Sequence, residues 1–178
     1  MSLSPIVADL STIGLAVLGI AAFIDVRDRL IPNSLVIVTL GSGLLIRLVS
    51  DPYRIWLSLI ICFGIFAALA YASRHNAVGG GDAKMIAAVT LLVPPERVLP
   101  LLLDIALAGG IVAVVYLVAR FGLSRHPPSL AYVSQPEGRG LGSLLRNEGS
   151  RIVGGGPMPY GVAIAAGFAY CLLREAVR

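Results

Sequence analysis

The stretch AAFIDVRDRLIPN, residues 21–33, shows how this chain is organised: an apolar run ends at Asp25, and a short polar turn leads to Pro32 and Asn33. A second stretch, VGGGDAKMIAA at residues 78–88, places Asp82 after three glycines and before another apolar segment. A charged side chain near lipid is costly, so it is rare and usually functional. Two such carboxylates, each in a distinctive local sequence, indicate acid–base chemistry at a membrane boundary.

The composition indicates a membrane protein. Of the 178 residues, 57% are hydrophobic and 13% are charged, with a mean hydropathy of +0.86, whereas a soluble domain is about 25% charged. The apolar residues form long runs, and a membrane-spanning helix needs roughly 17–25 mostly apolar residues. We therefore expect an all-α polytopic membrane protein that forms a single domain over residues 1–178, with a retained first span and one long polar loop at about 122–156.

Six spanning segments fit the chain. Their expected ranges are about Ile6–Ile24, Leu35–Leu48, Ile55–Ala72, Ala83–Val93, Val98–Phe121 and Met158–Leu173. The fourth would reach only about 16 Å at ~1.5 Å per residue, roughly half of a ~30 Å hydrocarbon core, because Pro94 and Pro95 stop it. Either this helix continues past the prolines with a kink, or it begins below the membrane surface, where the glycines supply irregular backbone.

The basic residues predict an orientation, because cytoplasmic loops carry an excess of Lys and Arg. One side of the membrane would hold Arg27, Arg29, Arg74, Lys84, Arg120, Arg125, Arg139, Arg146 and Arg151. The other side would hold Arg47, Arg54, Arg97, Arg174 and Arg178. The larger group predicts that both termini lie outside and that Asp25 and Asp82 share the cytoplasmic side.

Other functional classes find little support in the sequence. The net charge of +4 comes from thirteen Arg and one Lys that flank apolar segments, so we interpret it as topology and not as nucleic-acid binding. Cys62 and Cys171 each stand alone in an apolar run, and His75 and His126 lack a ligand partner at a useful spacing. We therefore expect no metal, no cofactor and no nucleic-acid partner.

Two carboxylates that face one another cannot both ionise cheaply, so one keeps a proton and the pair offers a base and an acid together. Such a pair can activate water for peptide hydrolysis without a metal. Asp82 stands where an aspartate caps a helix, and the helix dipole and Lys84 both favour its charged form. We therefore expect Asp82 to be the base and Asp25 to carry the proton.

Each aspartate also has a purely structural interpretation. Asp25 could belong to an ordinary solvated turn, Asp82 could be a simple helix cap, and Asp28 competes with Asp25 for a catalytic role. Asp104, inside the fifth segment, is expected to face the protein interior as a structural polar contact near the outer side.

Three motifs, taken together, resemble the signatures of the type IV prepilin peptidases. Asp25 followed by Ile31-Pro32-Asn33 resembles the D-x5-IPN signature of that family. The run from Gly79 to Lys84 resembles GxGDxK, and Met158-Pro159-Tyr160-Gly161 resembles a C-terminal PYG element. The resemblance extends from about Ala21 to Gly167, and it implies a GxGD membrane aspartic protease fold.

The resemblance implies a membrane-embedded aspartic endopeptidase that cuts the basic leader from prepilins or pseudopilins. Asp25 and Asp82 would be its catalytic pair, on the cytoplasmic face of a bacterial inner membrane. In the matched motifs, Gly79 and Gly81 would shape the catalytic loop, and Lys84 would support Asp82 or the leader site. The full set of supporting positions carried over from the motifs is Pro32, Asn33, Gly79, Gly81, Lys84, Pro159, Tyr160 and Gly161. Partners would be the leader peptides and membrane lipid.

The departures from the family pattern indicate which kind of family member to expect. Larger members carry two CxxC pairs and an N-methyltransferase activity, and this sequence has no CxxC. It looks like the short, peptidase-only forms that serve Flp-type, tight-adherence pili. Two alternatives of other classes are a small ion-coupled transporter, which a broken helix with buried carboxylates would suit, and a scaffold subunit of a pilus or secretion system.

Overall fold

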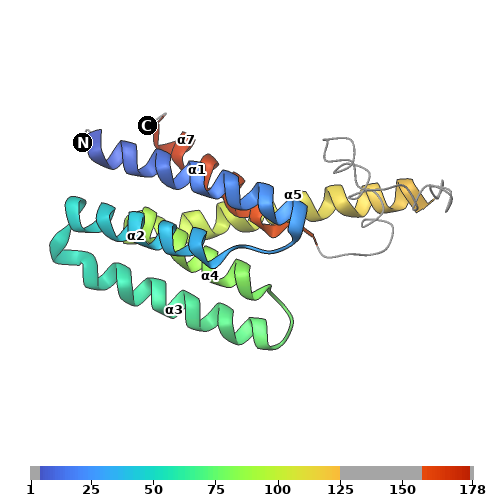
Figure 1. The fold of residues 1–178 in the computed structure, drawn as a ribbon, viewed down its shortest axis with the longest axis horizontal. Helices are drawn as coiled ribbons and strands as arrows, with labels where there is room; N and C mark the ends of the chain where they lie inside the picture. The colour runs from blue at the N-terminus through green and yellow to red at the C-terminus, as the bar shows by residue number, and fades with distance from the viewer. Residues whose placement is uncertain (1–4, 125–157, 177–178) are drawn as a thin grey trace. The chain divides into compact units, whose positions relative to one another are not determined.

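The computed structural model describes residues 5–124 and 158–176, and within these ranges the chain is helical (Figure 1). The helices are α1 (Pro5–Asp28), α2 (Asn33–Ser50), α3 (Ile55–Arg74), α4 (Gly80–Val89), α5 (Val98–Ser124) and α7 (Tyr160–Ala176). Short 3₁₀ turns, η1 (Pro52–Arg54), η2 (Thr90–Leu92) and η3 (Pro95–Arg97), join some of them. Each of the six expected segments contains one α-helix, as the hydrophobic pattern predicted.

Within the described residues, three stretches are long and apolar enough to cross a membrane: Asn33–Ser50, Pro52–Arg74 and Pro95–Phe121. A shorter apolar helix covers Tyr160–Arg174. These helices confirm the class of an all-α, multi-pass membrane protein. The orientation of the termini, which the basic residues predicted, stays a prediction.

The chain forms two compact units. The first comprises residues 1–109 and 159–178 and contains α1 to α4, the part of α5 up to Gly109, and α7; the second comprises residues 110–158. The expectation of a single domain stays a prediction. The expected loop at 122–156 lies outside the described residues except for its start, where α5 continues to Ser124.

Local sequence explains where the first helices end. The residue after α1, Arg29, adopts a left-handed conformation with φ 55°, and Pro32 then precedes α2 with φ −60°. At the end of α3, the left-handed Asn76 (φ 57°) donates its N–H to Ser73, and Ala77 donates to Ala72. This pair of hydrogen bonds is a Schellman motif, in which asparagine tolerates the left-handed conformation.

The fourth segment is short, as expected, and its prolines end it. The helix α4 has ten residues and continues only through η2, after which Val93 is extended with φ −113° and ψ 154°. A new helix starts at Val98. The option that the helix runs on past Pro94 and Pro95 with a kink is therefore wrong, because proline lacks the N–H that a continuing helix needs.

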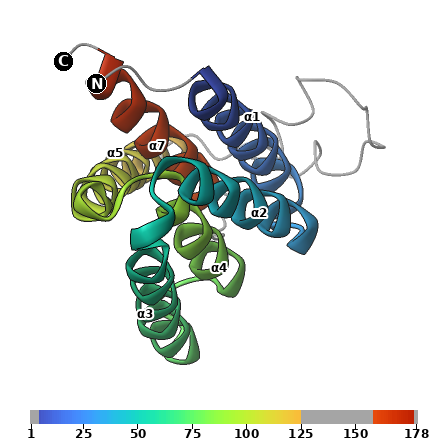
Figure 2. The same ribbon diagram turned by 90° about the vertical axis from the view of Figure 1, so that its left-hand side faces the viewer.

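The α4 segment lies at the centre of the first unit. Figure 2 shows α4 between α2 and α3, and α7 packs against both α1 and α4. The α4 side chains of Met85, Ile86, Ala88 and Val89 are all buried in the core. The short helix therefore serves as the inner element on which the longer apolar helices pack.

The buried Asp104 has an ion-pair partner in this core. Arg174 Nη2 lies 3.3 Å from Asp104 Oδ2, and the guanidinium of Arg174 also lies over the ring of Tyr170. The prediction that Asp104 faces the protein interior as a polar contact is confirmed. The ion pair links α5 to α7.

A glycine allows the close approach of α2 to the turn η2. A Cβ atom built on Gly43 would lie 2.6 Å from Leu91 Cβ, whereas one built on Gly41 meets nothing within 4 Å. We expect Gly43→Ala to lower the free energy of unfolding by about 1–3 kcal/mol, because an extra methyl group overpacks this contact. Gly41→Ala, two residues away on the same helix, is the matched control and should leave stability unchanged or slightly higher.

The measurement is thermal unfolding of the detergent-solubilised protein, followed by a thiol-reactive dye. Cys62 and Cys171 are both buried and neither is in a disulfide, so dye reactivity reports the opening of the core. Equal melting temperatures for the two variants would contradict the close contact between Gly43 and Leu91.

Candidate active site

Asp25 lies in the last turn of α1 and is buried, with 6% of its surface exposed. Its competitor Asp28 has a side chain that is 53% exposed and lies 3.6 Å from Arg27 in a surface ion pair. The two acidic residues of this motif therefore differ in their exposure to solvent. Asp25 points into the protein, and the interpretation of it as an ordinary solvated turn is wrong.

The Asp25 carboxylate is fixed by the start of α7. The backbone N–H of Gly161 donates a hydrogen bond of 2.7 Å to Asp25 Oδ2. A Cβ atom at position 161 would lie only 3.0 Å from both Cβ and Oδ2 of Asp25, so glycine permits this approach. Backbone N–H groups at a helix start also stabilise a negative charge. Pro159, which precedes this turn, is buried as well.

Asp82 lies in the first turn of α4, which begins three residues earlier than the expected Ala83. The residue at the N-cap is Gly79, so the expectation of Asp82 as the cap is wrong. The carboxylate reaches back toward Gly79: a Cβ atom built there would lie 2.5 Å from Asp82 Oδ2. A built Cβ at Gly80 would meet only Ser73 Oγ, at 3.6 Å.

The two aspartates interact electrostatically. Asp82 lies outside the three long apolar helices, and its pKa is raised to about 6, mainly by burial and further by the negative charge of Asp25. A like charge raises a carboxyl pKa only when it is close and poorly screened. The fold therefore brings together the two carboxylates that lie 57 positions apart in the sequence.

Tyr160 is a neighbour of this pair. It is the first residue of α7, and its hydroxyl group lies within electrostatic range of Asp82. Its ring rests against α5, where a Cβ atom built on Gly109 would come within 2.9 Å of Tyr160 Cε2. Sequence reasoning named Tyr160 and missed Gly109; the signal that could have found it is the Gly109-Gly110 pair inside an apolar segment.

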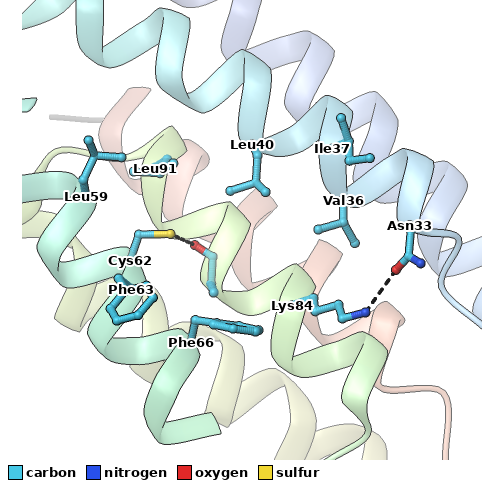
Figure 3. A pocket seen from close by; sticks show the side chains of 11 residues that line it. Asn33, Val36, Ile37, Leu40, Leu59, Cys62, Phe63, Phe66, Lys84 and Leu91 are labelled. Atoms are coloured by element: carbon cyan, nitrogen blue, oxygen red, sulfur yellow. Dashed lines mark hydrogen bonds between the residues drawn. The ribbon is translucent and has the colours of Figure 1, made fainter. Parts of the chain in front are cut away.

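The remaining motif residues connect the loop after α1 to the start of α4. A Cβ atom built on Gly81 would lie 3.4 Å from Ile31 Cβ, an ordinary contact distance. Lys84 Nζ donates a 3.2 Å hydrogen bond to Asn33 Oδ1 at the start of α2 (Figure 3). Pro32 is the N-cap residue of α2. The first and second motifs therefore contact each other directly.

The geometry brings Asp25, Asp82, Tyr160 and Gly161 to one place, at the end of α1 and the starts of α4 and α7. Lys84 lies apart from them, because side chains two positions apart on a helix do not share a face. A buried pair of coupled carboxylates with a backbone N–H donor can exchange protons with a water molecule and a bound carbonyl group.

Comparison with known proteins agrees with the motifs. Over 79 residues, 42% of this chain, the sequence is 37% identical to Prepilin peptidase EppA of Methanothermobacter thermautotrophicus, of which the matched region covers 20%. The chain thus spans about a fifth of the length of this curated relative. No solved structure matches the chain. The model of the type IV leader peptidase family matches residues 12–114, more than half of the sequence. The chain belongs to the type IV leader peptidase family.

Proposed function

We propose that this protein is a membrane-embedded aspartic endopeptidase that removes the leader peptide from type IV prepilins or pseudopilins. The observation that carries the proposal is that Asp25 and Asp82, from separate motifs on different helices, lie close enough for the negative charge of Asp25 to raise the pKa of Asp82. Family membership supports the reaction class. The relative from Methanothermobacter thermautotrophicus is named as a prepilin peptidase, which supports the same substrate class.

In the proposed mechanism, one proton is shared by the aspartate pair. The ionised carboxylate takes a proton from a water molecule, whose oxygen attacks the scissile carbonyl carbon. The protonated carboxyl group donates its proton to the carbonyl oxygen, which forms a tetrahedral intermediate. Collapse of this intermediate breaks the C–N bond: the carboxyl group that took the proton from water passes it to the leaving amine. The other carboxylate takes the proton of one hydroxyl group of the intermediate as the C=O bond forms again, so the pair again holds one proton.

The contacts favour Asp25 as the base and Asp82 as the proton carrier, the reverse of the expectation from sequence. Asp25 accepts the short Gly161 hydrogen bond, which stabilises its ionised form. Asp82 has the raised pKa, so it holds a proton more readily than an ordinary carboxyl group. Because the two groups are coupled, the apparent pKa values belong to the pair.

The finer features of the proposal come from the sequence. The excess of basic residues on one side supports a cytoplasmic position for the aspartate pair, and the proposed membrane is the inner membrane of a bacterium. The sequence has no CxxC, which supports a peptidase of the Flp type without N-methyltransferase activity. The expected product is therefore a trimmed pilin with an unmethylated N-terminus.

The proposal is tested by co-expression with a pilin-like substrate in a host that lacks its own leader peptidase. Mass spectrometry of the pilin N-terminus is the readout. Wild type should yield trimmed pilin, and Asp25→Asn and Asp82→Asn should each lower cleavage by at least ~10²-fold, since acid–base catalysis contributes about 10²–10⁴-fold.

Asp28→Asn is the matched control, because Asp28 lies three residues from Asp25 on the same helix and is exposed. It should process the substrate like wild type. Normal trimming by the inserted Asp25→Asn or Asp82→Asn variant would contradict the proposed mechanism, as would loss of trimming in Asp28→Asn alone.

A second prediction concerns the position of the Asp82 carboxylate. Gly79→Ala places a methyl group only 2.5 Å from the present position of Asp82 Oδ2, so the carboxylate must move from that position. We expect kcat to fall by roughly 10²-fold, the loss typical of a misplaced catalytic group, with little change in melting temperature. Gly80→Ala adds the same methyl group one residue later, where there is room, and should retain activity. Equal activity of the two variants would count against this placement.

A further inference from the structure

An apolar groove lies on the face of α4 that is turned toward α2 and α3. It has a volume of about 680 Å³ and is lined by side chains of α2, α3 and α4. This volume is within the ~300–1,000 Å³ range typical of small-molecule sites. The groove extends over about two helical turns, or roughly 10 Å, along α4 from Lys84 to Leu91.

The polarity of the groove changes along its length (Figure 3). Its two polar residues, Asn33 and Lys84, lie together at one end and are joined by a hydrogen bond. The other nine lining residues are apolar or cysteine, with Phe63 and Phe66 on α3 and Leu40 on α2 among them. A groove with one polar end and an apolar body matches the shape of an amphiphile.

The surroundings of the groove favour a hydrocarbon chain over water. Two of its walls, α2 and α3, belong to stretches long and apolar enough to cross a membrane. Two of the lining side chains on these helices, Ile37 and Phe63, are 67% and 72% exposed in the protein alone. Water would form few hydrogen bonds along these apolar walls, whereas an acyl chain that enters the groove stays in an apolar environment.

The polar end carries a positive charge without a carboxylate partner in the described ranges. Lys84 Nζ has three N–H donors, and within residues 5–124 and 158–176 its hydrogen-bond partner is the neutral Asn33. Two N–H donors therefore remain for an anion at the mouth of the groove. Lys84 is also the only lysine in the sequence.

We propose that this groove binds an anionic phospholipid of the surrounding membrane, with the headgroup phosphate on Lys84 and Asn33 and an acyl chain between α2 and α3. The site lies on a different face of α4 from Asp82, because positions i and i+2 of a helix do not face each other. Lipid binding is thus separate from the proposed leader cleavage, and either can fail without the other.

The test is native mass spectrometry of the full chain, released from detergent micelles that contain equal amounts of phosphatidylglycerol and phosphatidylcholine with identical acyl chains. Wild type should carry phosphatidylglycerol as its first bound lipid, with about five-fold preference, the effect of one lysine near an anionic surface. Lys84→Gln should lose this preference, although its amide can still donate a hydrogen bond to Asn33. Lys84→Arg should retain it.

Arg74→Gln is the matched control, because Arg74 is an exposed cation at the end of α3, outside the groove lining. It removes the same charge and should keep the wild-type preference. Melting temperatures of all variants establish that each is folded. Equal loss of preference in Lys84→Gln and Arg74→Gln would overturn the site in favour of general charge attraction.

Two further arms separate the alternative occupants. Glycerol phosphate at the lipid concentration should fail to displace the bound phospholipid; effective displacement would show a plain anion site and overturn the role of the acyl chain. An apolar helical peptide from a pilin should also leave the lipid in place. If the peptide displaces the lipid from wild type and does not do so from Lys84→Gln, the groove binds substrate, and the proposal is overturned.

Discussion

The hydrogen bond from the Gly161 N–H group to Asp25 joins parts of the chain that lie 136 positions apart. It requires that α1 and α7 pack side by side and that no side chain stands at position 161. It also puts Tyr160 near Asp82. The hydrogen bond therefore holds α1 and α7 of the first unit together near both aspartates. The proposed chemistry depends on this packing.

The short helix α4 contributes to both proposed sites through two different faces. Its first turn carries Asp82 toward α1 and α7, while its opposite face carries Lys84 toward Asn33 and the apolar groove. The prolines after η2 end the segment early, so α2 and α3 extend along it as the longer, membrane-facing walls. In our proposals, one face acts on a peptide and the other holds a lipid.

Much of the fold could be predicted from the sequence, because apolar runs between proline and glycine clusters leave few choices for helix positions. The aspartates could be singled out because charge near lipid is costly, and the three motifs could be connected through their family resemblance. The sequence motif favoured Asp25 over Asp28, but the difference in burial between the two needed the structure, since it depends on which way the last turn of α1 faces. The contact of Tyr160 with Gly109 also depends on packing between helices that are distant in the sequence, and such packing cannot be inferred from local sequence.

The helix cap and the proton assignment were harder to predict for a different reason. The glycine run gives no signal of where α4 begins, and the helix starts at Gly80, so Asp82 falls inside the first turn. The acid and base roles then depend on hydrogen bonds and burial from other helices, namely the Gly161 N–H group on Asp25 and the enclosed position of Asp82.

The most direct test of the central claim, that Asp25 and Asp82 act as one coupled pair, is an infrared titration of the protonated carboxyl groups. Wild type should show a carboxyl group that titrates near pH 6 and is missing in Asp82→Asn. In Asp25→Asn the same group should titrate at lower pH, because the neighbouring negative charge is gone. An unchanged titration of Asp82 in Asp25→Asn would contradict the coupling and, with it, the proposed mechanism.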